Sequence, residues 1–260
     1  MPSDKLNISL VQPDIEWENK AANFAQYEHQ IANIKDKKEI VVLPEMFSTG
    51  FSMHPERFAE TMDGEAVSWM KQMAQQHRCI LTGSLMIEEQ GQYFNRLIWM
   101  MPNGAYYTYD KRHLFAFAQE DQHYTAGNKR LVVSVNGWKI CLVVCYDLRF
   151  PVWLRNQSQE YDALIVIANW PERRAHAWKS LLIARAIENM SYVIGVNRVG
   201  IDGNGINHSG DSCVISPLGE VLWEQKDQAV VHSMTMDKNH LMNCRAQFPF
   251  LNDADKFVLM

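Results

Sequence analysis

Of the five cysteines in the sequence, Cys145 occupies the position best suited to chemistry. It follows the apolar run from Trp138 to Val144, and the chain becomes polar after it, with Tyr146 and Asp147. A free thiol titrates near ~8.5, so a nearby base is needed to make it a good nucleophile at neutral pH. Most free cysteines are simply small buried hydrophobes, so a catalytic Cys145 requires partners of matching chemistry.

Two other segments supply such partners. Glu45 follows the apolar run from Glu39 to Leu43, at the carboxyl end of a predicted buried strand, where α/β folds bind ligands. A carboxylate in a partly dry setting has a raised pKa, which suits a general base. Lys111 follows an aromatic extended stretch, and its ammonium can stabilise developing negative charge. Taken singly, Glu45 is better explained as a turn residue and Lys111 as a solvated charge, so the prediction depends on all three.

Other chemistry has less support. Cys141 and Cys145 are four residues apart on one predicted strand, which is poor geometry for chelating zinc. Period-two alternation places Cys141, Val143 and Cys145 on one side, and Cys141 is predicted to belong to the core. The nine histidines allow a Cys–His pair, but none lies in a recognisable signature. The sequence has no P-loop, no Gly-x-Gly-x-x-Gly after a strand and no Gly-x-Ser-x-Gly.

The elements that must position these residues alternate in type. Strands are predicted at residues 6–11 and 39–43 with a helix at about 18–36 between them, an order that favours a parallel pair with a right-handed crossover. Further predicted elements are helices at about 64–77 and 174–189, hairpins at 79–87/93–101, 131–135/138–144 and 213–216/220–224, and strands at 105–109, 163–168 and 192–197. Two sheets packed face to face with helices outside fit this count best. Glu45 and Cys145 are expected at the same end of the sheet.

Length and charge limit the class of protein. The 260 residues fit one large α/β domain, residues 1–260, without a linker. A net charge of −5 without a basic stripe argues against a nucleic-acid surface. No run of eighteen apolar residues predicts a membrane span, and the N-terminal residues lack the pattern of a signal peptide. We therefore expect a cytoplasmic protein with free thiols.

The C-terminal tail, about residues 239–260, has no clear periodicity. It nevertheless carries large apolar side chains, namely Phe248, Phe250, Leu251 and Phe257. An irregular apolar segment needs a cover. We expect this tail to pack at a dimer interface.

Three segments, in order, resemble the signature segments of the nitrilase-like carbon–nitrogen hydrolase superfamily. They are Leu43-Pro44-Glu45, Lys111-Arg112-His113-Leu114-Phe115 and Cys145-Tyr146-Asp147-Leu148-Arg149-Phe150-Pro151. The similarity continues through Ala168–Pro171, Ala184–Asn189 and Gly195–Gly200, and so covers essentially the whole chain. The branch that it most resembles is the bacterial omega-amidases, which deaminate 2-oxoglutaramate and similar ω-amides of 2-oxo dicarboxylic acids.

The resemblance implies an α/β fold, a four-layer αββα sandwich, a homodimer, and neither a metal nor an organic cofactor. It also implies that Glu45, Lys111 and Cys145 are the catalytic glutamate, lysine and cysteine. Many members carry a further glutamate after the lysine, and Glu120 matches it. Residues 116–119 stand where relatives often have a glycine-containing turn.

The expected reaction is acyl transfer through a thioester. Glu45 takes the proton of Cys145, and the thiolate attacks the carbonyl of a small amide. The Lys111 ammonium and the backbone N–H of Tyr146 then hold the oxyanion. Glu120 is expected to orient Lys111 or the substrate amide.

Two further residues are expected to contact the substrate. Trp170 is predicted to wall the pocket, with packing at a strand end as the alternative. Arg173 is predicted to clamp a substrate carboxylate, because a guanidinium pairs with it in bidentate fashion. The alternative is an ordinary surface arginine beside Arg174.

Other functions remain open at the level of the sequence. A nitrilase, a carbamoyl-amide hydrolase or an aliphatic amidase of the same superfamily would carry the same three residues. A non-catalytic binding scaffold is a further alternative, although a binding role places no requirement on all three. The pocket residues around 115–120 and 170–173 must decide the substrate.

Overall fold

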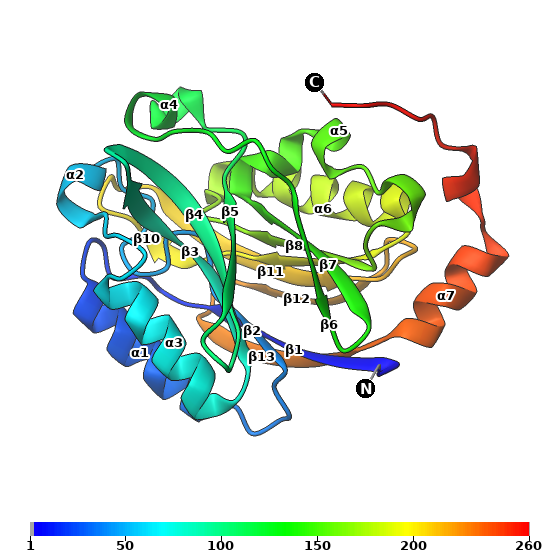
Figure 1. Ribbon diagram of the computed structural model, residues 1–260, viewed down its shortest axis with the longest axis horizontal. Helices are drawn as coiled ribbons and strands as arrows, with labels where there is room; N and C mark the ends of the chain where they lie inside the picture. The colour runs from blue at the N-terminus through cyan, green and yellow to red at the C-terminus, as the bar shows by residue number, and fades with distance from the viewer. Residues whose placement is uncertain (1–2, 260) are drawn as a thin grey trace.

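The apolar runs of the sequence form the central strands of two β-sheets that face each other (Figure 1). This computed structural model describes residues 3–259; positions 1, 2 and 260, at the ends of the predicted domain and its tail, lie outside the described residues. The first sheet runs in the order β13 (Val230–Asp237), β1 (Lys5–Gln12), β2 (Ile40–Val42), β3 (Ile80–Glu89), β4 (Gln92–Met100), β5 (Tyr106–Asp110). The second runs β10 (Val199–Ile201), β11 (Asn207–Ile215), β9 (Tyr192–Val196), β8 (Ala163–Ile167), β7 (Trp138–Val144), β6 (Leu131–Val135), with β12 (Val221–Lys226) beside β11.

Helices cover the outer face of each sheet. α1 (Lys20–Ala32) and α3 (Glu65–His77) pack on the first sheet, and α6 (Ala175–Asn189) packs on the second. The short helices are α2 (Pro55–Phe58), α4 (Glu120–His123) and α5 (Pro151–Leu154), and α7 (Lys238–Gln247) follows β13. The predicted αββα sandwich is thus confirmed. Among residues 3–259, no helix has the length and apolar character needed to cross a membrane.

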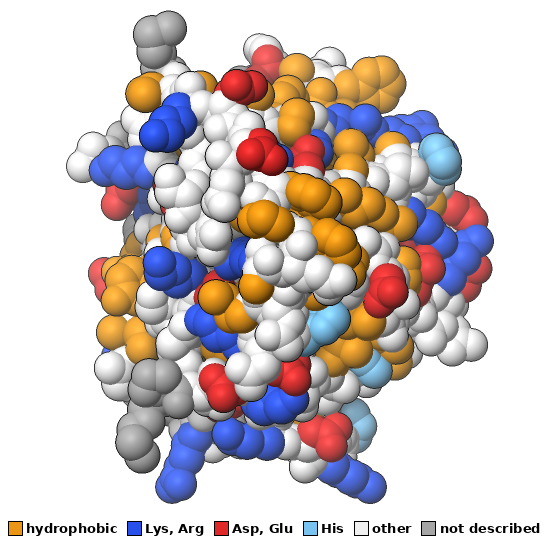
Figure 2. Space-filling view, turned by 90° about the vertical axis from the view of Figure 1, so that its right-hand side faces the viewer, with side chains coloured by type: hydrophobic (Ala, Val, Ile, Leu, Met, Phe, Trp, Pro, Cys, Tyr) orange, Lys and Arg blue, Asp and Glu red, His pale blue; other side chains and the backbone are white. Residues whose placement is uncertain are grey.

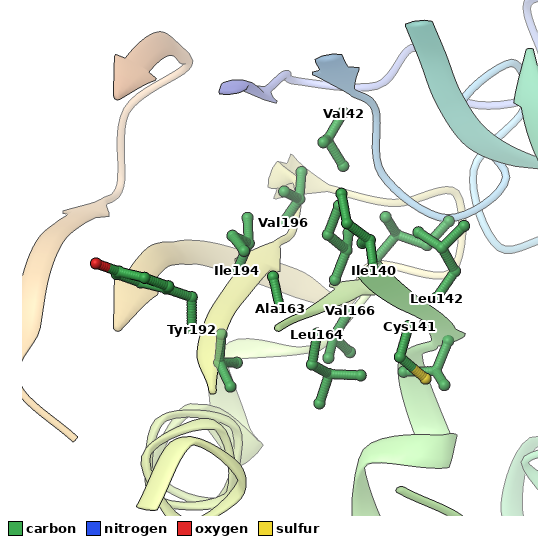
Figure 3. Packing of buried hydrophobic residues seen from close by; sticks show 14 of the residues in the cluster. Val42, Ile140, Cys141, Leu142, Ala163, Leu164, Val166, Tyr192, Ile194 and Val196 are labelled. Carbon is green, nitrogen blue, oxygen red and sulfur yellow. The ribbon is translucent and has the colours of Figure 1, made fainter. Parts of the chain in front are cut away.

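Alternation along the strands divides the core into layers. In Figure 3, Ile140 and Leu142 of β7 point toward Val42 of β2, across the space between the sheets. Cys141 and Leu164 point the opposite way, toward the helical layer. Cys141 is buried, as predicted. Each sheet therefore buries both faces, which explains why its central strands read as continuous apolar runs.

The predicted elements mostly occur, with shifted ends. The first helix begins at Lys20 because the Asn19 side chain accepts a hydrogen bond from the N–H of Ala22, and it ends at Ala32. The second strand of the last predicted hairpin extends to Lys226, and the first begins at Asn207. β13 was not predicted, yet it pairs antiparallel with β1 at the edge of the first sheet.

Two expectations were wrong. The tail is not irregular throughout, because residues 238–247 form α7, capped by the Asp237 side chain. Its buried Arg245 donates to the backbone oxygens of Tyr161 and Met190, which anchors the helix on the second sheet. In addition, Glu45 and Cys145 do not follow strands of one sheet: β2 belongs to the first sheet and β7 to the second.

Candidate active site

Cys145 occupies a sharp turn at the end of β7. The strand ends at Val144, and Cys145 begins a 3-10 turn with a φ of +47°. This left-handed conformation costs a non-glycine residue roughly 1–2 kcal/mol. The predicted alternation from Cys141 therefore does not extend to Cys145; instead, the turn places the half-buried Cys145 at the wall of a pocket.

A buried cluster of charges lies beside this thiol. The Lys111 Nζ is 2.9 Å from Oε1 of Glu45 and 2.8 Å from Oε2 of Glu120. All three side chains are fully buried. The structure thus brings together Glu45 from the turn after β2, Lys111 from the end of β5 and Glu120 from α4, as expected from the sequence.

Two asparagines that were not predicted hold the carboxylates in place. The backbone N–H of Asn169 donates to Oε2 of Glu45 over 2.8 Å, and its side-chain amide donates to the Glu45 carbonyl oxygen. The Asn95 amide donates to Oε1 of Glu45 over 2.8 Å and to Oε1 of Glu120 over 3.2 Å. Asn169 lies in a segment that carried the family resemblance. Asn95 lies in β4 beside the polar Arg96, and the sequence carried no signal that set it apart.

The surroundings set the protonation states of the cluster. Burial acts to lower the pKa of Lys111, but the negative charges of Glu120 and Glu45 outweigh burial and raise this pKa above its ordinary value. Burial and then the charge of Glu45 raise the pKa of Cys145 well above its ordinary value, and Lys111 offsets only part of the rise. At neutral pH the lysine is therefore an ammonium and the cysteine a protonated thiol.

The pocket in front of Cys145 has a volume of about 310 Å³. Its walls are mostly aromatic and cationic, formed by Phe51, Met53, Lys111, Phe115, Phe117, Ala118, Cys145, Tyr146, Arg149, Asn169, Trp170, Pro171, Arg173, Arg174, Asp202, Asn204, Ile206 and His208. Trp170 lines the pocket and is also buried, with its Nε1 donating to the Arg174 carbonyl oxygen. Both readings of Trp170 from the sequence therefore apply.

Three arginines lie at this pocket. Arg173 is exposed, whereas Arg149 and Arg174 are half-buried. The Arg149 guanidinium lies 5.0 Å from the centre of the Trp170 ring, and that of Arg174 lies 5.0 Å from the centre of the Phe115 ring. Within the described part of the chain, none of the three forms a salt bridge with a carboxylate. Burial, followed by repulsion from Arg173, lowers the pKa of Arg174, so this side of the pocket is electrostatically suited to an anion.

The described residues contain no group of three or more His, Cys, Asp or Glu side chains placed to hold a metal ion. The chemistry that this site offers lies in a thiol, two carboxylates and an ammonium.

Solved structures share this arrangement of sheets and helices. A CN-hydrolase superfamily protein from Xanthomonas campestris, whose crystal structure has an arsenic adduct in the active site, superposes with a TM-score of 0.96. The two sequences are 43% identical, and the match covers 98% of this chain and 99% of that one. The fold is therefore that of the carbon–nitrogen hydrolases.

Residues 7–240 match the family model described as Carbon-nitrogen hydrolase, and the chain belongs to this family. It is a hydrolase that acts on carbon–nitrogen bonds other than peptide bonds. The Omega-amidase YafV of Escherichia coli is 42% identical over 98% of both chains. The 2-oxoglutaramate amidase of Bacillus subtilis is 30% identical over 97% of this chain and 98% of its own. The family, the fold and the amidase class predicted from the sequence are thus confirmed.

Proposed function

We propose that the protein hydrolyses the terminal amide of small ω-amides of 2-oxo dicarboxylic acids, such as 2-oxoglutaramate, to the acid and ammonia. The observation that carries this proposal is the side of the pocket formed by Arg149, Arg173 and Arg174, next to Cys145. Cations without carboxylate partners in a partly dry pocket favour a substrate that brings its own carboxylate. The names of the Escherichia coli and Bacillus subtilis relatives support the same substrate class.

Acylation begins with proton transfer from Cys145 to Glu45. The thiolate sulfur then bonds to the amide carbonyl carbon, and the Lys111 ammonium and the Tyr146 N–H hold the oxyanion. The tetrahedral adduct collapses, the C–N bond breaks, and Glu45 returns its proton to the departing nitrogen, which leaves as ammonia. Glu120, at 2.8 Å from the Lys111 Nζ, keeps the ammonium in position.

Deacylation uses the same carboxylate. Glu45 takes a proton from a water molecule as the oxygen of that water attacks the thioester carbon. The C–S bond breaks, the proton passes to the sulfur, and the acid product leaves. The Asn169 and Asn95 donors keep the Glu45 carboxylate in place through both stages.

Arg173 remains part of the proposed carboxylate clamp, and the structure adds two candidates to it. Arg149 and Arg174 are more buried than Arg173, and each lies against an aromatic ring that restricts its motion. A restricted, partly desolvated guanidinium binds a carboxylate more strongly than a freely solvated one. Trp170 positions Arg149 and closes one wall of the pocket.

Ammonia release tests the substrate class. We expect kcat/KM for 2-oxoglutaramate to exceed that for a simple aliphatic amide of equal length by about a hundredfold, because the aliphatic amide lacks the carboxylate. Nitriles and carbamoyl compounds in the same screen test the other activities of the superfamily. Equal efficiency with the aliphatic amide, or preference for a nitrile or carbamoyl compound, would contradict the proposed substrate.

The proposed nucleophile has its own test. Cys145→Ala should abolish ammonia release, while the thermal unfolding midpoint stays close to that of the wild type. Cys141→Ala is the matched control, since Cys141 faces the helical layer, and should retain turnover per folded molecule. More than trace activity in purified Cys145→Ala protein would show that another group attacks the amide.

We also propose a cytoplasmic homodimer. All five cysteines are free, which suits a reducing compartment. The face with α7 and the C-terminal tail shows several groups of exposed hydrophobic side chains (Figure 2). Phe250 and Val258 are exposed by 61% and 88%, and a partner subunit would cover them.

A further inference from the structure

A buried carboxylate that takes no part in the proposed reaction lies two residues after Cys145. Asp147 is fully buried and receives hydrogen bonds on both oxygens. Its Oδ2 accepts from the Tyr109 hydroxyl over 2.7 Å and from the Val144 N–H over 3.0 Å. Its Oδ1 accepts from the His113 N–H over 2.9 Å and lies 2.8 Å from Nδ1 of the His113 ring. A buried carboxylate needs this many partners to offset its lost hydration.

The spacing of these partners links them to the reaction. Tyr109 and His113 stand two residues before and two residues after Lys111. Val144 immediately precedes Cys145. One carboxylate therefore joins both flanks of the lysine to the turn that carries the thiol.

Pairing between strands does not set the separation of Lys111 and Cys145. Lys111 follows β5 at the edge of the first sheet, and Cys145 follows β7 in the second sheet. The two sheets share no backbone ladder at this point, so packing and side-chain contacts alone set the separation of the two groups. The hydrogen bonds of Asp147 cross this gap next to both Lys111 and Cys145.

The neighbours of Asp147 restrict its motion further. The Trp153 Nε1 donates to the Tyr109 hydroxyl over 3.1 Å, which directs the hydroxyl proton toward Asp147. The His113 ring is stacked on Phe150, with their centroids 3.8 Å apart. The group is thus rigid on both sides.

We propose that Asp147 is a positioning residue, which holds the Lys111 ammonium and the Cys145 thiol at the separation that acyl transfer requires. The proposal rests on the proposed roles of those two residues, but not on which amide is the substrate. A displacement of about 1 Å in a catalytic group can cost about a hundredfold in rate. Asp147 therefore affects the chemical step indirectly, through the positions of Lys111 and Cys145.

Two near-isosteric variants test this role. Asp147→Asn places an amide N–H₂ against at least one of its former donors, and we expect kcat to fall by about 10- to 100-fold. Tyr109→Phe removes one of the four partners, and we expect a fall of about tenfold. In both, KM should stay within about twofold of the wild type, because the arginines of the pocket are untouched. Tyr161→Phe is the matched control: its hydroxyl is equally buried but donates to the Leu154 carbonyl oxygen, and its kcat should not change.

Several readouts separate positioning from stability. Rates are expressed per folded molecule, with the folded fraction measured by near-UV circular dichroism, and the best amide in the ammonia-release screen is the substrate. The double variant Asp147→Asn/Tyr109→Phe should be no slower than Asp147→Asn alone, since both act through one carboxylate. The role of Asp147 would be overturned by a loss of activity that matches the unfolded fraction, or by a KM that rises as kcat falls. A double variant whose loss equals the product of the two single losses would overturn it as well. If Asp147→Asn does not fold, Tyr109→Phe alone decides.

Failure of the proposed function gives a different result. A different substrate preference would change the best amide in the screen and leave the comparison of variants intact. Activity retained by Cys145→Ala would refute the cysteine mechanism, and this result would be obtained with Asp147 unchanged.

Discussion

At the scale of single residues, burial decides what each charged side chain can do. Lys111 keeps its charge inside the protein because two carboxylates lie within 3 Å of its Nζ. Arg149 and Arg174 lie nearby without a carboxylate partner among residues 3–259, so their charge is available to a ligand. The same residue type thus serves the cluster or the pocket according to what lies around it.

Arg174 provides a test of substrate recognition. Arg174→Ala should raise KM for 2-oxoglutaramate by about 10- to 100-fold, since a hydrogen bond to a charged group contributes roughly 1.5–3 kcal/mol. Arg174→Lys should recover part of the loss, because it keeps the charge but not the bidentate geometry. Turnover of a simple aliphatic amide should not respond to either change. An equal loss for both substrates would show that Arg174 supports the pocket wall and does not bind the carboxylate.

His208 should make the protein sensitive to acid. It is buried at the pocket, and burial together with the charge of Arg198 lowers its pKa from 6.5 to about 4. Above pH 6.5 the ring is neutral in both folded and unfolded chains and has no effect. Below this pH the unfolded chain takes up the proton first, so the free energy of unfolding falls, by about 3 kcal/mol when pH 4 is reached.

Urea unfolding at pH 7 and pH 4.5 measures this effect. His208→Gln should lose less stability between the two pH values than the wild type does. His123→Gln, at an exposed histidine of α4, is the matched control and should behave as the wild type. The same pH dependence in His208→Gln and the wild type would exclude His208 as the source.

At the scale of elements, strand ends and their turns place the groups of the proposed active site. β2, β5, β7 and β8 each deliver one polar residue to the site within three residues of the strand's end, namely Glu45, Lys111, Cys145 and Asn169. Polarity after an apolar run was visible in the sequence, which is why three of these were predicted. Asn95 was not, because it lies within β4, where nothing marks which strand faces the cluster.

Gly127 supports the end of β5 that carries Lys111. Its N–H donates to the Lys111 carbonyl oxygen over 2.9 Å, and a Cβ at this position would lie 2.1 Å from the Asp110 carbonyl oxygen. Because that contact is with backbone, Gly127→Ala must displace the strand end, and we expect about 1–3 kcal/mol of lost stability and at least a tenfold lower kcat.

Gly91→Ala is the control for this change. A Cβ there meets no atom within 4 Å, although its φ of +75° imposes a cost of about 1 kcal/mol. Its stability should fall slightly while kcat per folded molecule is unchanged. An unaltered kcat in Gly127→Ala would show that the loop around Gly127 shifts, while the end of β5 stays in place.

At the scale of the whole molecule, the C-terminal segment extends along one side of the sandwich. α7 is anchored by Arg245, but the residues after it leave Phe250 and Val258 exposed. Leu259 reaches a surface hollow lined by Val152 of α5. The exposed apolar surface on this face is the basis for the proposed dimer.

Sedimentation tests that assembly. The wild type should sediment at twice the chain mass of 30.1 kDa, and Phe250→Asp with Val152→Asp should shift it toward the monomer, because burying a charge in an interface is costly. Val221→Asp, at an exposed valine of β12, is the matched control. A monomeric wild type at micromolar concentration would contradict the dimer.

Hydrophobic periodicity predicted most of the helices and strands that form the layers, because it records which face of an element is buried; the edge strand β13 was missed. The sequence also led to the prediction of Glu45, Lys111 and Cys145, because each brings polar chemistry to the end of an extended run, whereas Glu120 was predicted from the family resemblance. α7 escaped prediction since only a few of its side chains are buried.

Which residues meet across the two sheets depends on the packing of the folded chain. Contacts such as Asn95 with Glu45 and Asp147 with His113 join segments more than thirty residues apart, and no local pattern reports a partner at that distance. The cationic side of the pocket depends on the same fact, since Arg149 and Arg174 come from different turns. Periodicity reports burial within an element, whereas the register and packing of the two sheets set the distances on which the chemistry depends.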